Sequence, residues 1–495
     1  MQLIETINTA VNDFVWGLPM LVLLVGTGIL MTVLTKFFQI SHIGHWFKHT
    51  LGGIFKNKHI TAHTSHEDKQ ISQFQSLCTA LAATIGTGNI AGVAAALATG
   101  GPGAIFWMWI VAFFGMMTNY SENVLGIFYR RKNSEGEWCG GAMYYLEDGL
   151  GSKKGCRKIG KILAVLFSIF CVIASFGIGN MSQINSISVN VYEVLGIYPW
   201  VTGSVLAVLA GVVVIGGLKW IANVTEKLVP IMAIFYIIGC LILVVAHIGN
   251  VGAAFVAIFK GAFALEAVGG GIVGSGVKAA VTMGMKRGVF SNEAGLGSSV
   301  MVHSASNVKE PVRQGMWGIF EVFADTIIVC TLTALTVLTS GLVDLNTGAM
   351  LTDSQKTALV AEVFENAIGK PGGIFIACAI TLFAFSTVLG WSIYGSKAFE
   401  YLFGTEVTMV YKVIFIVVIF FGAIMNLQLA WDLSDTFNGL MAMPNLIGVV
   451  ALSGTVMKIT KNYVDRVIKG KDEKPMYSAI PEIQKEQEER TDDEA

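Results

Sequence analysis

Long apolar stretches recur along this chain, and they restrict its fold more than any other feature of the sequence. A window of about 20 residues finds eleven segments apolar enough to cross a hydrocarbon layer about 30 Å thick. Charged residues make up only 14% of the 495 positions, against about 25% in soluble domains. We therefore predict an all-α polytopic membrane protein with eleven transmembrane helices. The expected spans lie near residues 14–36, 74–99, 104–129, 161–190, 200–218, 228–247, 270–304, 315–340, 373–396, 408–426 and 433–458.

Polar or glycine-rich motifs interrupt four of these spans. They are GTGN in 74–99, GIGNMSQIN in 161–190, FSNEAGLG in 270–304 and FSTVLGW in 373–396. A glycine inside a helix costs about 1 kcal/mol relative to alanine, and a buried asparagine amide needs a hydrogen-bonding partner. We expect the functional site at these interruptions.

Lysine and arginine in the short loops predict the orientation of the chain. Segment 36–72 is rich in lysine and segment 130–161 in both lysine and arginine, whereas residues 1–13 and the links near 100 and 197 contain neither. Because basic loops stay in the cytoplasm, we expect the N-terminus outside and the C-terminus inside. The net charge is only -1 and the basic residues are spread over loops, so the sequence gives no sign of a nucleic-acid partner.

The spans divide into repeats once the first is set aside. The remaining ten form two groups of five that start from opposite sides of the membrane, and each group opens with a broken helix. This pattern is typical of a secondary transporter with its site near the middle of the membrane. The expected units are an extra N-terminal helix with an amphipathic cytoplasmic loop (1–72), a first repeat (73–249), an extracellular link (250–269), a second repeat (270–460) and a disordered cytoplasmic tail (461–495).

The stretch ATIGTGNIAG in span 74–99 offers two kinds of ligand if the helix unwinds there. The half-helix after Gly88 would present free N–H groups and the positive end of a dipole to a carboxylate. The half-helix before it would end in free carbonyls near Ala82 and Ile85, which suit a sodium ion. Asn89 could coordinate the ion or hold the substrate. The alternative is that these glycines only let two helices pack closely. Gly28 lies outside the repeats, and we expect it to tolerate a side chain.

Four long motifs resemble one transporter family. TALAATIGTGNIAGVAAALATGGPGAIFWMW, GGAMYYLEDGLG, RGVFSNEAGLGS and FAFSTVLGW are similar to sequences of the alanine/glycine:cation symporters, also called sodium:alanine symporters. The resemblance covers about residues 72–460. It implies a LeuT-like 5+5 inverted repeat and sodium-coupled symport of alanine and glycine into the cell, across a prokaryotic plasma membrane, by alternating access. It also implies that Na+ is the coupling ion and that the protein lies in the lipid bilayer. No enzymatic activity is implied. We expect a monomer.

Three alternatives to sodium symport remain open at this level. The first is proton-coupled transport of small amino acids, and the second is a channel. The third is a polytopic membrane enzyme, against which the chain contains no HExxH and no GxSxG motif.

The resemblance also implies a sodium site. The carbonyls of Ala82 and Ile85 and the hydroxyls of Ser386 and Thr387 match its ligands, which are all oxygens, as hard cations prefer. Thr84, with the asparagine of GTGN, would belong to a second sodium position whose other ligands the sequence does not place.

The remaining residues suggested for the site would hold the substrate: Thr87, Gly88, Asn89, Gln183, Phe290, Asn292 and Trp391. The resemblance assigns the substrate carboxylate to the amides of Thr87 and Gly88. Phe290 could cap a small substrate, and Asn292 could hold its amino group. Trp391 would be a wall of the pocket or a core residue.

Several polar residues near the site have more than one reading. Glu293 could act on the substrate, satisfy Arg287, or accept from loose backbone N–H groups. Gln183 and Asn185 could reach the site or only bond between helices. The other acidic residues in or near spans could form a proton relay or cap helices and pair with cations: Glu122, Glu321, Asp325, Asp432 and Asp435.

Overall fold

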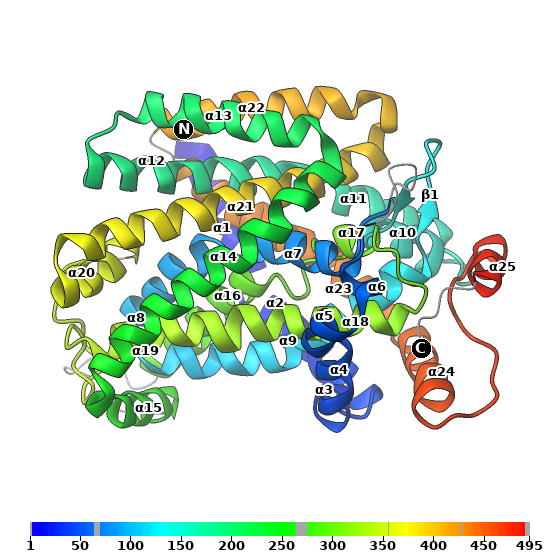
Figure 1. Cartoon of the computed structure of the whole chain (residues 1–495), viewed down its shortest axis with the longest axis horizontal. Coiled ribbons are helices and arrows are strands. Elements are labelled where there is room, and N and C mark those ends of the chain that lie inside the picture. The colour runs from blue at the N-terminus through cyan, green and yellow to red at the C-terminus, as the bar shows by residue number, and fades with distance from the viewer. Residues whose placement is uncertain (1, 64–69, 264–274, 355, 426–427, 491–495) are drawn as a thin grey trace.

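The computed structural model is a bundle of long helices with one short hairpin (Figure 1). It describes residues 2–63, 70–263, 275–354, 356–425 and 428–490. Strands β1 (Arg131–Lys132) and β2 (Trp138–Cys139) pair antiparallel, with Arg131 opposite Cys139. The predicted all-α class is confirmed.

The helices of the first half begin near the N-terminus and end at Phe263. They are α1 (Gln2–Val15), α2 (Leu18–Leu34), α3 (Phe38–Ser41), α4 (Ile43–His49), α5 (Leu51–Lys56), α6 (Lys58–Thr61), α7 (Gln73–Thr84), α8 (Val93–Gly100), α9 (Gly103–Phe128), α10 (Ala142–Tyr144), α11 (Arg157–Phe176), α12 (Ser182–Leu195), α13 (Pro199–Ile215), α14 (Gly217–Ala246) and α15 (Ile248–Phe263). Wider π-helical turns are inserted at η1 (Gly88–Gly92), η2 (Tyr145–Leu150) and η3 (Gly177–Met181).

The second half starts at Ser275 in the described chain. Its helices are α16 (Ser275–Asn292), α17 (Val300–His303), α18 (Pro311–Val322), α19 (Thr331–Thr339), α20 (Lys356–Ile368), α21 (Lys370–Phe403), α22 (Thr408–Ile424), α23 (Gln428–Ala451), α24 (Ser453–Tyr463) and α25 (Pro481–Glu489). The π-helical turns η4 (Phe323–Cys330) and η6 (Val464–Ile468) and the 3₁₀ turn η5 (Thr405–Val407) complete it.

The membrane spans follow from helix length and hydropathy. Seven helices of the described chain are long and apolar enough to cross a membrane, or up to nine if two bent pairs each count as one span. These nine correspond to nine of the expected spans. Expected span 200–218 is matched by the shorter helix α13, and the first residues of expected span 270–304 lie outside the described residues. The exact number of eleven therefore stays a prediction.

The expected extracellular link 250–269 is helical in its described part. Helix α15 packs on the start of α9, where the Cβ of any side chain at Gly103 would lie 2.2 Å from the carbonyl carbon of Gly261. Phe259 and Phe263 place their rings 5.7 Å and 5.0 Å from the ring of Phe106. The aromatic residues, spaced four apart on one helix face, pack the described part of this segment against α9.

Helix α2 packs against α9, and this contact corrects the expectation for Gly28. A Cβ at Gly28 would lie 2.7 Å from the carbonyl oxygen of Phe114, so the position has no room for a side chain. Gly26, one half-turn away, has no atom within 4 Å of such a Cβ.

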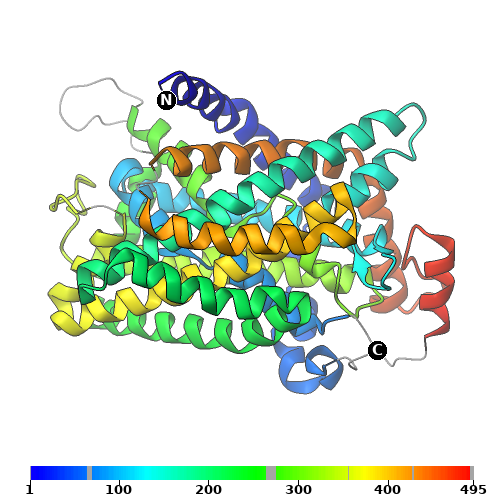
Figure 2. The same cartoon turned by 90° about the horizontal axis from the view of Figure 1, so that it is seen from above.

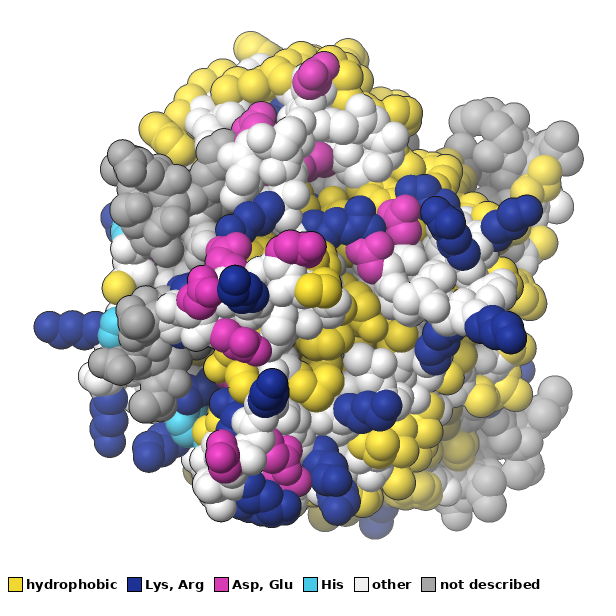
Figure 3. All heavy atoms as spheres, turned by 90° about the vertical axis from the view of Figure 1, so that its right-hand side faces the viewer, with side chains coloured by type: hydrophobic (Ala, Val, Ile, Leu, Met, Phe, Trp, Pro, Cys, Tyr) yellow, Lys and Arg dark blue, Asp and Glu magenta, His cyan; other side chains and the backbone are white. Residues whose placement is uncertain are grey.

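The two ends of the bundle carry different segments. Figures 1 and 2 place α25 at one end and α20 at the other, and Figure 1 shows β1 and α10 beside α25 and α15 near α20. Lysine, arginine, aspartate and glutamate are interspersed over the end face that carries α25 (Figure 3). One predicted cytoplasmic loop, 130–161, therefore lies at the end that carries the C-terminal tail.

The tail differs from the disordered segment that we expected. Helix α25 lies beyond a stretch in which the Ala479 amide donates to the Phe128 carbonyl at 2.9 Å. The Lys132 ammonium lies 2.7 Å from the Glu486 carboxylate. Its charged residues therefore find partners on the loop that contains β1, which explains why the highly polar sequence is ordered as far as the structure describes it.

Candidate functional site

The break in α7 is the feature around which the site is built. The helix begins with a capping box between Ser72 and Gln75 and ends at Thr84, and the chain bends by 50° before it continues as η1 and α8. Ile85 has ψ 87° instead of about −42° for a helix, which turns its carbonyl away from the helical direction. The Asn89 side-chain oxygen accepts a hydrogen bond from the Gly86 amide at 2.9 Å. A side chain therefore stabilises the unwound turn.

Helix α21 presents the two predicted sodium-binding hydroxyls to this break. The Ser386 hydroxyl lies 3.3 Å from the Ala82 carbonyl oxygen, and a Cβ at Gly86 would lie 2.4 Å from the Thr387 hydroxyl. For a metal–oxygen distance of about 2.4 Å, in the range found for Ca2+, neighbouring ligand oxygens lie about 3.4 Å apart. The spacing of the Ala82 and Ser386 oxygens fits one cation between the two helices.

A close helix contact sets this spacing. A Cβ at Gly390 would lie 2.7 Å from the Cβ of Ala83 and 2.9 Å from its nitrogen. The missing side chain lets α21 approach α7 one turn away from Ser386 and Thr387, as small residues do in membrane bundles.

The other side of the break faces the predicted substrate residues. The Thr87 hydroxyl donates to the Gln183 side-chain oxygen at 3.0 Å, and a Cβ at Gly88 would lie 3.2 Å from the Phe290 ring. Gln183 thus reaches the break, whereas Asn185 donates to the Met425 carbonyl at 3.2 Å and joins α12 to the end of α22. The two residues, equally open in the sequence, have different surroundings.

A buried carboxylate that the sequence reasoning did not place in the site contacts the same break. Asp325 in η4 accepts from the Asn89 amide at 2.6 Å and from the Ser291 hydroxyl at 2.8 Å. Thr326 donates to it at 2.8 Å and accepts from Asn292 at 3.1 Å. Asp325 therefore links the first break to the end of α16. An acidic residue in the middle of an apolar span was the available signal.

Glu293 and Trp391 contact each other at the second break. The Trp391 indole donates to one Glu293 oxygen at 2.8 Å, and Ser298 donates to the other at 2.5 Å. Trp391 also packs on η3, since a Cβ at Gly179 would lie 2.3 Å from its Cβ. In the described part of the chain, the partners of the Glu293 carboxylate are thus side chains, and neither Arg287 nor a backbone N–H is among them.

Thr84 and Glu122 have their described hydrogen-bonding partners outside the first break. The Thr84 hydroxyl lies 3.3 Å from the Ala80 carbonyl of its own helix, so the described contacts do not join it to Asn89. Glu122 accepts from the side-chain amide of Asn445, and its electrostatic partners include the backbone amides of Gly295 and Gly297. Glu122 therefore stabilises the second break through Asn445 and the amides of Gly295 and Gly297.

The fold matches that of a solved transporter. MhsT, in a crystal structure with L-phenylalanine, aligns with a TM-score of 0.51 over 80% of this chain and 99% of its own, at 13% sequence identity. That likeness shows the fold of the chain, in which a helix is broken at the candidate site.

The family follows from sequence comparison. A model of the sodium:alanine symporter family matches residues 1–477. The sodium/alanine symporter AgcS of Methanococcus maripaludis is 46% identical over 94% of this chain and 98% of its own. The amino-acid carrier protein AlsT of Bacillus subtilis is 33% identical over 95% of each chain. The protein belongs to the sodium:alanine symporter family and is a multi-pass membrane protein.

Proposed function

We propose that the protein is a sodium-coupled symporter that carries alanine and glycine into the cell by alternating access. The observation that carries this proposal is the broken helix α7, whose Ala82 carbonyl lies 3.3 Å from the Ser386 hydroxyl while Gly88 faces Phe290. One break thus offers oxygens to a cation on one side and backbone amides to a carboxylate on the other. The similarity to the sodium/alanine symporter AgcS supports sodium and alanine as ligands.

In this proposal the substrate carboxylate binds to the amides of Thr87 and Gly88. Sodium is held by Ala82, Ile85, Ser386 and Thr387. Gln183 accepts a hydrogen bond from Thr87 in the structure. When the substrate binds, Gln183 gives up this bond and contacts the substrate instead.

The small size of the substrate follows from the same surroundings. Gly88 and the partly buried ring of Phe290 leave little space beyond the substrate α-carbon, with Trp391 as a further wall. We expect glycine to compete with alanine and leucine not to compete. Because one methylene in an apolar pocket discriminates by about 1–3 kcal/mol, serine should compete weakly. Alaninamide, which lacks the carboxylate, should bind far more weakly than alanine.

Asp325 favours a second candidate, in which a proton or a second cation accompanies the substrate. Its carboxylate is fully buried and takes hydrogen bonds from the neutral side chains of Asn89, Ser291 and Thr326. A buried carboxylate is stabilised by a bound proton or cation. A second cation at Asp325 would include Asn89, whereas Thr84 would have to rotate away from Ala80 to join it.

The orientation and surroundings belong to the same proposal. The N-terminus lies outside the cell and the C-terminus in the cytoplasm of a plasma membrane, and the transporter works as a monomer. The shared end of the loop 130–161 and the tail supports this topology.

Uptake by purified protein in sealed vesicles tests the proposal. Labelled alanine should accumulate when sodium is higher outside, and the initial rate should saturate with alanine concentration. A proton gradient without sodium should not drive accumulation. Uptake that follows the proton gradient alone would favour the second candidate, and flux without saturation would contradict symport.

A further inference from the structure

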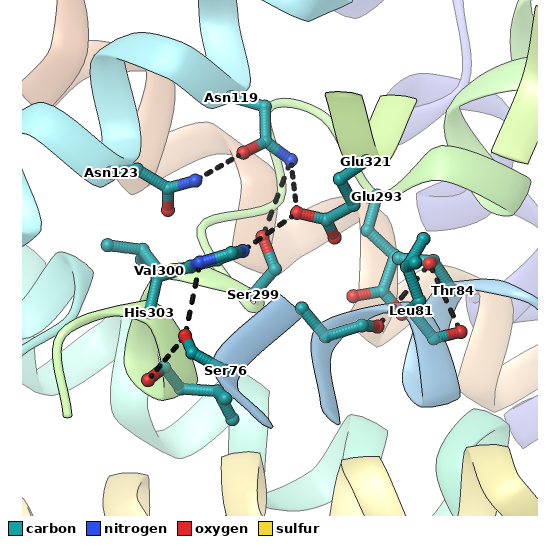
Figure 4. A network of polar contacts seen from close by, with 12 residues as sticks. Ser76, Leu81, Thr84, Asn119, Asn123, Glu293, Ser299, Val300, His303 and Glu321 are labelled. Atoms are coloured by element: carbon teal, nitrogen blue, oxygen red, sulfur yellow. Dashed lines mark hydrogen bonds and ion pairs between the residues drawn. The ribbon is translucent and has the colours of Figure 1, made fainter. Parts of the chain in front are cut away.

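A buried polar network lies between α7, α17 and α18, and the proposed transport site does not use it. His303 is its centre, with Nε2 3.0 Å from the Glu321 carboxylate. Its Nδ1 lies 2.5 Å from the Gln314 amide nitrogen and 3.3 Å from the Ser76 hydroxyl. Both His303 and Glu321 have 0% exposed side chains. Figure 4 shows these groups as a chain of contacts that runs from Glu321 through His303 to Ser76, with Asn119 beside Glu321.

The hydrogen bonds define which ring nitrogen carries a proton in neutral His303. The Gln314 amide nitrogen can only donate, so Nδ1 of His303 accepts. The hydrogen of the neutral ring then sits on Nε2 and points to Glu321. Gln314 also donates to Ser76 at 3.2 Å, which ties α18 to α7.

The described donors to the buried Glu321 carboxylate are all neutral side chains. One carboxylate oxygen accepts from His303 at 3.0 Å and from Asn119 at 3.4 Å, and the Ser299 hydroxyl also bonds the carboxylate. The other oxygen is buried and has no hydrogen-bonding partner in the described structure. An ionised carboxylate with one bare oxygen is unfavourable away from water. A pair of neutral histidine and ionised glutamate therefore gains stability from one additional proton, on either residue.

The titratable groups around Glu321 also favour one additional proton on the pair of His303 and Glu321. The groups on which Glu321 acts electrostatically are acidic: Glu122 of α9, Glu293 after α16, Asp325 of η4 and Tyr394 of α21. Cys78 of α7 and Arg313 of α18 have their electrostatic partners elsewhere, at Glu226 and at His45, His49 and Tyr463. Arg130 donates to the carbonyls of Ser304, Ser306 and Val308 beyond His303.

We infer that His303 and Glu321 form a proton site that holds one proton while α7 is packed against α17 and α18. The site releases this proton to the cytoplasm when α7 moves away. The inference rests on the proposed alternating access and topology, because the inner half of a broken helix must move for the cytoplasmic side to open. The motion would break the contacts of Ser76 with His303 and Gln314.

The direction of the pH effect follows from linkage. In the open state water reaches both groups, whose ordinary pKa values are about 4.3 for glutamate and about 6.5 for histidine. The open pair therefore holds the extra proton only below about pH 6.5. Above that pH the closed state binds more protons than the open state, so acid favours the closed state by up to roughly tenfold per pH unit.

The test compares sodium-driven alanine uptake at about pH 6.5 and about pH 8, with the same pH on both sides so that vesicle orientation does not matter. The wild-type rate should be severalfold higher at the upper pH. In Glu321→Gln the amide oxygen still accepts from His303 but needs no proton, so the rate should change little. Glu400→Gln is the matched control, because Glu400 is a buried carboxylate paired with Lys397 at 2.9 Å; it should keep the wild-type profile.

An unchanged profile in Glu321→Gln protein with the wild-type melting temperature would overturn the proton site. If that variant does not fold, a measurement on the wild type decides. Sodium and alanine favour the closed state, so adding both to purified protein near pH 8 should take up protons from a weak buffer; no uptake would also overturn the site. Loss of sodium-driven uptake in the wild type at every pH would instead contradict the proposed function.

Discussion

The two helix breaks of this transporter are built differently. The first, at 85–87, is three residues long, and its side-chain support comes from Asn89, which accepts from the Gly86 amide. The second, at 293–299, is seven residues long and includes positive φ angles at Glu293, Gly295 and Gly297. Asn292 accepts from the Ala294 amide, and Asn445 donates to the Gly295 carbonyl at 2.9 Å.

This difference suits the first break to binding ligands and the second break to stabilising the fold. Backbone groups that a helix end leaves without partners can bind ligands, and the short first break has few side chains that compete for them. The polar groups of the second break are held by Glu122, Asn445 and Ser298. We therefore expect substitutions at the first break to change ligand affinity and substitutions behind the second break to change stability.

The largest effect should come from Gly88→Val. Its Cβ would lie 3.2 Å from the Phe290 ring and 3.4 Å from the Ser291 Cα, and the added methyl groups would fill the space in front of the amides. Equilibrium binding of labelled alanine should weaken by more than about 100-fold, or about 2.7 kcal/mol. Gly26→Val is the matched control, because that position is open. Wild-type affinity in a folded Gly88→Val protein would mean that the break only serves packing.

A smaller effect is expected at the sodium hydroxyls. Ser386→Ala removes one oxygen from the shell that contains the Ala82 carbonyl, which should raise the sodium concentration for half-maximal uptake by about 5- to 30-fold, or about 1–2 kcal/mol. Thr387→Ala should act in the same direction. Ser392→Ala, on the same helix with its hydroxyl bonded to Leu389, should leave the sodium dependence unchanged. The same sodium dependence in all three variants would remove both hydroxyls from the site.

The smallest effect on ligands should come from behind the second break. Asn445→Ala deletes the donor to Gly295 and to Glu122, which should cost about 1–3 kcal/mol of stability and lower the melting temperature. Alanine affinity of the folded protein should change by less than about twofold, or about 0.4 kcal/mol. Asn462→Ala, at an exposed contact with Lys474, is the control. A large loss of affinity without a loss of stability would erase the distinction between the two breaks.

The sequence was sufficient to predict the helical class and the position of the first break. Apolar length and glycine content report on the chain locally, so GTGN and the end of α7 coincide. It also led to the contact between α7 and α21, but only through family resemblance, because Ala82 and Ser386 are 304 residues apart.

The sequence could not place the acidic residues. Asp325, Glu321 and Glu122 all read as carboxylates in apolar spans, yet one contacts Asn89, one contacts His303 and one supports Gly295. Their roles depend on which helices meet, and helix pairing has no local signal. The prediction that Gly28 tolerates a side chain was wrong for the same reason, because its neighbour Phe114 belongs to another helix.

The docked tail has a consequence for the order in which the molecule is assembled. Ser478 and Ala479 contact the Phe128 carbonyl across about 350 positions of the chain, and Glu486 meets Lys132. Since a chain emerges from the ribosome N-terminus first at about 5–20 residues per second, the first repeat spends tens of seconds in the membrane before these partners exist. The contacts of Phe128 and Lys132 with residues 478–486 can therefore form only after that later segment has been synthesised.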